Sequence, residues 1–160
     1  MNSTVVRPPH SADVFVREMH SEDVPSVITL LNEGPTATGW SAGSLAREVQ
    51  SGAAWVAVQS EEIVGFVVGR VAADECEILN IAVERTRRRR GIGTQLLLAA
   101  LGLAKSHGCG RVYLEVRQSN ISAISLYSRH GFSECGRRPS YYRSPVEDAV
   151  LLRADLHSRA

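Results

Sequence analysis

The chain has few of the features that would place it in a specialised structural class. Its cysteines, Cys76, Cys109 and Cys135, form neither a CxxC pair nor an even-numbered set, which predicts free thiols rather than a disulfide framework or a zinc site. The longest strongly apolar run, residues 96–104, is about half as long as a membrane-crossing helix. We therefore expect no metal ion and no membrane partner.

The chain also has no large excess of positive or negative charge, because its net charge is only +1. Hydrophobic residues make up 44% of the chain and charged residues 22%, a balance that is typical of globular proteins and argues against a nucleic-acid partner. The N-terminus carries no apolar signal core, so we expect a cytoplasmic protein. A chain of 160 residues suits one core, which predicts a loose leader over residues 1–12 and a single domain over residues 13–160, as a monomer or weak dimer.

The hydrophobic periodicity and the Gly, Pro and Asp punctuation predict a mixed α/β fold. Its order predicts one mixed central sheet of about six to seven strands with helices on both faces. The expected elements are a strand over 14–18, helices over 21–31 and 40–50, strands over 53–59, 63–73 and 75–83, a helix over 93–107, a strand over 112–116, a helix over 120–130, and strands over 132–142 and 149–155.

A segment rich in glycine and arginine joins the expected strand over 75–83 to the helix that follows it. Two glycines let the backbone approach a ligand closely, and the free N–H groups and positive dipole end of the helix favour an anion such as a pyrophosphate. The alternatives are a tight turn with solvated arginines or, less in keeping with the low net charge, a nucleic-acid-binding run. The segment reads Arg88-Arg89-Arg90-Gly91-Ile92-Gly93-Thr94, which is neither a GxxxxGK[ST] loop nor a GxGxxG fingerprint.

Together with six further motifs, this segment resembles the GNAT superfamily of N-acetyltransferases. Within that superfamily the chain is similar to the RimI-like group, which acetylates ribosomal-protein alanine and related protein N-termini, over about residues 14–155. The motifs, in order, are Arg88-x-x-Gly91-x-Gly93 after the strand Glu77–Val83, then Leu114-Glu115-Val116-Arg117, Ser119-Asn120, Leu126-Tyr127, Gly131-Phe132, Tyr141-Tyr142 and Glu147-Asp148-Ala149.

The resemblance implies acetyl-CoA as cofactor, with its pantetheine between two splayed parallel strands. Strand backbone groups would hold the pantetheine and the thioester oxygen, amides of the glycine turn would hold the pyrophosphate, and an arginine would lie near the 3'-phosphate. The cofactor-binding residues implied are Asn80, Ile81, Ala82, Val83, Arg88, Arg89, Arg90, Gly91, Ile92, Gly93, Thr94, Asn120 and Tyr127.

Acetyl transfer from a thioester to an amine requires a neutral amine, a donor to the developing oxyanion and a proton for the departing thiolate. Glu115 lies in a short apolar strand, where a carboxylate can be tuned towards a base, and we predict that it is the general base, acting through water. Glu77 is the rival base. The alternative for Glu115 is a surface carboxylate paired with Arg117 or Arg111.

Tyr127 follows Asn120 by seven residues, so both lie on one face of a helix and can line one channel. The resemblance implies that Tyr127 is the general acid that protonates the CoA sulfur and that Asn120 contacts the pantetheine. The alternatives are a core aromatic for Tyr127 and a helix cap for Asn120.

The predicted acceptor-binding residues are Trp40, Glu77, Tyr141 and Tyr142, with ordinary strand aromatics as the alternative for the two tyrosines. Gly39 precedes Trp40 where relatives often carry Pro. The predicted acceptor is a protein N-terminus, such as that of a ribosomal protein, because neutralising an α-amine at pH 7 costs about 3 kcal/mol less than neutralising lysine. The alternatives are a GNAT enzyme acting on a small-molecule amine or a lysine side chain, and a non-catalytic acyl-CoA-binding module.

Overall fold

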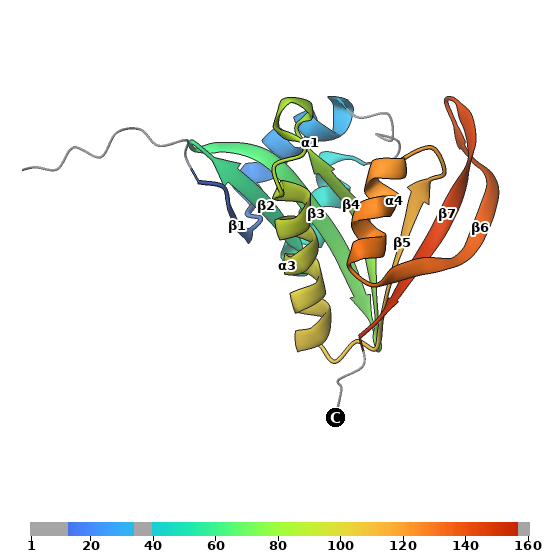
Figure 1. The fold of residues 1–160 in the computed structure, drawn as a ribbon. Helices are drawn as coiled ribbons and strands as arrows, with labels where there is room; N and C mark the ends of the chain where they lie inside the picture. The colour runs from blue at the N-terminus through green and yellow to red at the C-terminus, as the bar shows by residue number, and fades with distance from the viewer. Residues whose placement is uncertain (1–12, 34–39, 157–160) are drawn as a thin grey trace, which may run out of the picture.

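In a computed structural model of the chain, residues 13–33 and 40–156 are described, and they form a seven-stranded sheet with four α-helices (Figure 1). The predicted leader over residues 1–12 and the loop that contains Gly34, Pro35 and Gly39 lie outside the described residues. No helix within the described ranges is long and apolar enough to span a bilayer.

The strands lie in the order β1-β2-β3-β4-β5-β7-β6, and neighbours are antiparallel except for β4 and β5, which are parallel. The predicted mixed α/β fold class is therefore confirmed. The strands are β1 (Phe15–Glu18), β2 (Ala54–Gln59), β3 (Glu62–Ala72), β4 (Glu75–Val83), β5 (Arg111–Arg117), β6 (Phe132–Arg143) and β7 (Val146–Asp155). The helices are α1 (Val24–Glu33), α2 (Ala42–Gln50), α3 (Ile92–Ser106) and α4 (Ile121–Arg129), with 3-10 turns at Ser21–Asp23 and Arg85–Arg87.

The helices cover both faces of the sheet, and each face has its own apolar cluster. In Figure 1, α3 and α4 lie in front of the sheet, and α1 lies behind it. On the α3 face, Leu96 and Leu97 pack against strand residues such as Val67. On the α1 face, Val27 and Leu45 are fully buried in a second cluster with residues of β2 and β3. The sheet thus has a separate apolar core on each of its two faces.

Helix α3 approaches the sheet closely at Gly65 of β3. A Cβ atom at this position would lie 2.9 Å from the carbonyl oxygen of Ala82 and 3.1 Å from a side-chain carbon of Leu96. A larger residue would force either the strand or the helix to move. The glycine therefore fixes how deeply α3 sits over β3 and β4.

The sheet opens between its two parallel strands. β4 and β5 pair only from Glu75↔Arg111 to Ile78↔Leu114. Beyond that point β4 continues beside β3 alone and β5 beside β7 alone. The opening coincides with a β-bulge at Leu79, because Gly69 of β3 faces Ile78 and Val68 faces Asn80. Bulges bend a strand, so the bend of β4 and the parting from β5 occur at the same place.

A second irregularity shapes the far edge of the sheet. In the β6–β7 pair, Arg138 faces Ala149 and Tyr142 faces Glu147, so the three residues 139–141 stand opposite Asp148 alone. The backbone N–H of Ser140, at φ 51°, donates to Oδ1 of Asp148 at 2.8 Å. This side-chain bond fastens the bulged segment to β7 in place of a regular ladder bond.

Candidate active site

The parting of β4 and β5 creates a cleft of about 320 Å³. Both strands line it, together with the residue before the N-cap of α2, the N-cap and interior of α4, and two tyrosines of β6. The predicted site residues that it brings together are Trp40, Glu77, Asn80, Ile81, Glu115, Asn120, Tyr127, Tyr141 and Tyr142. Residues from distant parts of the sequence therefore converge on one opening in the sheet.

Tyr127 and Glu115 reach this cleft from opposite faces of the sheet. Leu114 and Val116 belong to the apolar cluster under α3, and Tyr127 of α4 belongs to the same cluster. Because side chains alternate along a strand, Glu115 and Arg117 project from the other face. The opening thus connects the α3–α4 side with the side that carries Trp40 and Glu115.

Tyr127 is buried, with 5% of its surface exposed, and its ring packs edge-on against Phe132 at a centroid distance of 5.7 Å. Burial raises the pKa of its hydroxyl well above the ordinary value, so the group stays protonated at neutral pH. The core-aromatic interpretation is correct, and the same ring also lines the cleft. Both uses of the side chain are compatible.

Asn120 caps α4, because its Oδ1 accepts from the backbone N–H of Ala123 at 3.3 Å. The helix-cap interpretation of this residue is therefore confirmed, and Asn120 lines the cleft as well. The cap sets where α4 begins, which in turn fixes the position of Tyr127 two turns further on.

Glu115 is half-buried and forms an ion pair with Arg138 of β6, with Nε and Oε1 at 2.8 Å. The interpretation of Glu115 as a partner of Arg117 or Arg111 is wrong. Arg117 pairs with Glu147 at 3.3 Å, and Arg111 lies 3.9 Å from Glu75. Glu115 has this partner because of the strand order, in which β7 lies next to β5 and β6 lies next to β7.

The two tyrosines of β6 cover the Glu115 side of the cleft. Tyr141 and Tyr142 pack edge to face, with ring centroids 5.1 Å apart. The guanidinium of Arg117 lies over the Tyr142 ring at 4.2 Å, and the negative charge of Glu115 raises the pKa of the Tyr141 hydroxyl. Tyr141 is 51% exposed. It is therefore positioned to contact a molecule that enters from solvent.

Glu77 lies on β4, beside Tyr113 of β5, and it too lines the cleft. It is exposed, and no salt bridge to it is found among the described residues. Both carboxylates can be reached from the same side of the sheet. The choice of Glu115 rather than Glu77 as base stays a prediction.

The glycine turn lies where β4 leads into α3. Gly91 is the N-cap of α3 at φ 80°, in the left-handed region that favours glycine. The first helical bond runs from Gln95 to Gly91, so the amides of the first turn are not used within the helix. The predicted residues Ala82 and Val83 lead directly into this turn. Together with the helix dipole, these amides make the turn suited to an anion.

The arginines around the turn divide into two kinds. Arg88, Arg89 and Arg90 are exposed, and Arg88 Nε donates to the carbonyl of Val83 at 3.1 Å. Arg87 is tied to the body of the protein, where it contacts Glu62 at 3.6 Å and Glu84 at 3.7 Å. The first three therefore supply positive charge to a ligand at the turn, and Arg87 holds the turn in place.

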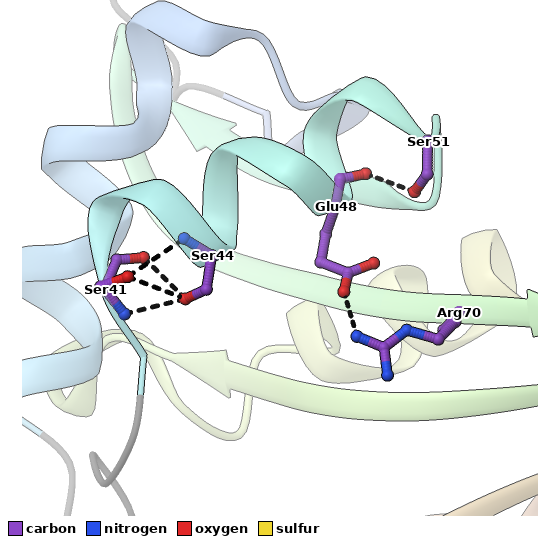
Figure 2. A network of polar contacts seen from close by, with 5 residues as sticks. All are labelled: Ser41, Ser44, Glu48, Ser51 and Arg70. Atoms are coloured by element: carbon purple, nitrogen blue, oxygen red, sulfur yellow. Dashed lines mark hydrogen bonds and ion pairs between the residues drawn. The ribbon is translucent and has the colours of Figure 1, made fainter.

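Trp40 precedes α2, a helix with polar contacts at both ends (Figure 2). Ser41 is the N-cap, and its Oγ accepts from the N–H of Ser44 at 3.1 Å while its own N–H donates to Oγ of Ser44 at 2.9 Å. At the other end of the helix, Glu48 forms an ion pair with Arg70 of β3. A helix held at both ends keeps the preceding Trp40 against the cleft.

Comparison with known proteins identifies the fold. Residues 16–132 match the model of the Acetyltransferase (GNAT) family. The chain belongs to the GNAT family of acetyltransferases. This confirms the resemblance found in the sequence.

The chain is similar to two curated acetyltransferases. It is 35% identical over 96 residues to the [Ribosomal protein bS18]-alanine N-acetyltransferase of Escherichia coli (strain K12), a match that covers 59% of this chain and 65% of the relative. It is 41% identical over 88 residues to the N-alpha-acetyltransferase RimI of Mycobacterium tuberculosis (strain ATCC 25618 / H37Rv), which covers 55% of this chain and 54% of that one. The matches thus span less than two thirds of either relative.

A solved GNAT structure extends the similarity over nearly all of the chain. The crystal structure of the ribosomal-protein-S18-alanine N-acetyltransferase from Escherichia coli superimposes with a TM-score of 0.81 at 27% identity, and covers 92% of this chain and 97% of that one. The two chains therefore share one overall fold.

The partners of Glu115 and Arg117, two residues that line the cleft, were not found from the sequence. Arg138 lies on Glu115, and Glu147 accepts from the backbone N–H of Ser119 as well as from Arg117. The sequence signal that could have found Arg138 is its position just before the Tyr141-Tyr142 pair. Among residues 13–33 and 40–156, no group of three or more His, Cys, Asp or Glu side chains could hold a metal ion.

Proposed function

We propose that this GNAT protein transfers the acetyl group of acetyl-CoA to the N-terminal α-amine of a protein. The observation that carries the proposal is the opening in the sheet, which Tyr127 and Glu115 line from opposite faces. Such an opening allows a thioester and an amine to meet without either one displacing the other.

The residues present fit acetyl-CoA, which supplies the activated acetyl group when it is bound. The edge of β4 that faces the opening has no partner strand beyond Ile78, so its backbone groups are available to the amide-containing pantetheine. At the end of the same strand, the Gly91 turn offers free amides, and Arg88, Arg89 and Arg90 offer charge for phosphates. An extended, anionic ligand would therefore follow β4 from the cleft to α3.

The proposed chemistry is direct attack in a ternary complex. Glu115 takes the proton that the acceptor amine must lose, directly or through a water molecule. Tyr127, which burial keeps protonated, gives its hydroxyl proton to the thiolate as the C–S bond breaks. The protonated α-amine thus gives one proton to Glu115 before it attacks, and it loses a second proton as the amide forms, which restores the Tyr127 hydroxyl through water. The sulfur leaves as a thiol.

A protein N-terminus is the acceptor that the cleft and the relatives support. An α-amine has an unperturbed pKa of about 8, so a carboxylate can neutralise it at modest cost. The exposed Tyr141 and the half-buried Trp40 and Tyr142 offer aromatic surface to the residues that follow the amine. The Escherichia coli relative is named for acetylating a ribosomal protein, and an acceptor of that kind would place the reaction in the cytoplasm.

The test is incubation with acetyl-CoA and a peptide that begins with Ala, followed by mass spectrometry. We expect one acetyl group on the α-amine, and no product from a matched peptide whose N-terminus is blocked but which contains lysine. Labelling of lysine alone would replace the proposal with a side-chain acetyltransferase. Tight CoA binding with no thiol release over a broad amine panel would replace it with a non-catalytic acyl-CoA-binding module.

A further inference from the structure

An arginine of β6 forms an ion pair with the proposed base, which itself lines the cleft. Nε of Arg138 lies 2.8 Å from Oε1 of Glu115, and its guanidinium carbon lies 5.8 Å from the centroid of the Tyr141 ring. The Arg138 side chain is 56% exposed, whereas that of Glu115 is only 22% exposed. The arginine is therefore not needed to fill the core, and its contact with the carboxylate calls for another explanation.

The strand order brings these two side chains together on one face of the sheet. β7 lies between β5 and β6, with Glu115 facing Leu151 and Arg138 facing Ala149. The two residues are thus diagonal neighbours across β7, on the face that also carries Arg117. The small side chain of Ala149 lets the arginine extend across β7 to the carboxylate.

The bulge of β6 fixes the backbone that follows Arg138. Residues 139–141 follow Arg138 directly, and the bond from the Ser140 N–H to Asp148 holds them against β7. The same bulge contains Tyr141, whose ring lies beside the guanidinium of Arg138. Arg138 is therefore held by its backbone as well as by its ion pair.

Among the described residues, the arginine that lines the cleft is Arg117, and it has a different carboxylate partner. Arg117 projects from the same face, but it lies over Tyr142 and pairs with Glu147. The remaining titratable groups that line this side of the cleft are Glu77 on β4 and the two tyrosines of β6. Within the described ranges, Arg138 is thus the cation in salt-bridge contact with Glu115.

We propose, on the basis of the function proposed above, that Arg138 is a positioning residue for the reaction. Its guanidinium holds Oε1 of the Glu115 carboxylate and so orients the carboxylate for the acceptor amine or a bridging water. An ion pair with an ionised donor is stronger and more directional than a neutral hydrogen bond, so it limits rotation of the carboxylate. Correct orientation of a catalytic group is a large part of its effect on the rate.

The first experiment compares Arg138→Met, Arg138→Lys and Arg137→Met in steady-state kinetics with the Ala peptide. Arg137 is a matched control because it neighbours Arg138, faces Val150 and pairs with Glu134 at 2.7 Å, away from the cleft. We expect Arg138→Met to lower kcat by about tenfold with the KM for acetyl-CoA unchanged, because only part of the base contribution is lost. Arg138→Lys should recover part of the loss, and Arg137→Met should match the wild type. Equal kcat values for the two Met variants would overturn the proposal.

A double-mutant cycle tests whether Arg138 acts through Glu115. We expect Arg138→Met to have little further effect in the Glu115→Gln background, because the carboxylate to be oriented is then absent. An undiminished loss in that background would overturn the proposal.

The pH dependence gives a readout that a purely structural role would not change. The tenfold loss at pH 7 should shrink towards pH 9, where the acceptor α-amine is already neutral and needs no base. A loss that is constant over this range would overturn the positioning role. If instead the wild-type protein acetylates no α-amine, the proposed function itself fails, and the two failures are thereby distinguished.

Discussion

Tyr127 combines packing and proposed chemistry in one side chain. Its ring is part of the core beneath α3 and α4, and its edge contact with Phe132 fixes the ring orientation. The same burial raises the pKa of the hydroxyl and keeps it protonated as a proton donor. Packing therefore prepares the group for the role of an acid.

Replacement of Tyr127 by Phe should separate the two uses. The ring and its contact with Phe132 remain, so we expect unchanged folding and little loss of CoA affinity. Without the proton for the departing thiolate, kcat should fall by about 100-fold. Thiol release and calorimetric CoA titration measure the two effects. Tyr113→Phe, a half-buried tyrosine of β5 that does not line the cleft, is the control. Unchanged turnover in Tyr127→Phe would reject its assignment as the acid.

At the scale of single elements, the capping and helix-ending residues in the sequence predicted the helices well. The helix expected over 93–107 is α3 at Ile92–Ser106, and that expected over 120–130 is α4 at Ile121–Arg129. Gly91, Asn120 and Gly131 mark these ends because each is suited to a cap or a left-handed turn. Helix ends of this kind depend on residues that are close together in the chain, so they can be predicted from the sequence alone.

The glycine turn gives a prediction at this scale. Gly91→Ala should lower the free energy of unfolding by about 1 kcal/mol, because alanine resists the φ of 80° there, and should weaken CoA binding. Gly102→Ala is the matched control inside the same helix, where an added Cβ meets nothing within 4 Å. It should raise the stability by about 0.5–1 kcal/mol. Urea unfolding and CoA titration measure both, and equal stabilities of the two variants would contradict the prediction.

The strands were predicted less completely than the helices. The last strand was expected over 149–155, but β7 begins at Val146. Glu147 and Asp148 resemble turn residues, yet they are accommodated in the strand because Glu147 pairs with Arg117 and Asp148 binds the N–H of Ser140. The bulges at Leu79 and at residues 139–141 have no local signal, because a bulge depends on the partner strand.

At the scale of the whole molecule, the sequence predicted the fold class but not the order of the strands. β7 lies between β5 and β6, and this order brings Arg138 into contact with Glu115 although the two residues are far apart in the chain. Sequence reasoning considered only arginines near Glu115 along the chain. Cross-strand partners follow from order and register, which periodicity does not reveal.

The two-sided cleft predicts how the substrates combine. Under the proposed chemistry the thioester and the amine enter from opposite faces, so initial-velocity plots should intersect, and CoA should compete with acetyl-CoA but not with the peptide. An acyl-enzyme route would give parallel lines instead. The thiols agree with direct transfer: burial raises the pKa of Cys76 to about 11, Cys109 is buried, and none of the three cysteines lines the cleft. Parallel initial-velocity plots would contradict the ternary complex.

The short pairing of β4 with β5 has a mechanical consequence. Strands β1 to β4 form one block of the sheet and β5, β7 and β6 form another, and only the ladder from Glu75↔Arg111 to Ile78↔Leu114 joins them directly. That ladder lies at one end of both strands, so a small rotation of one block against the other would change the far end of the opening most. A molecule that hydrogen-bonds to the exposed edge of β4 while touching β5 would act as a brace between the blocks, and the sheet would be stiffer when loaded than when free.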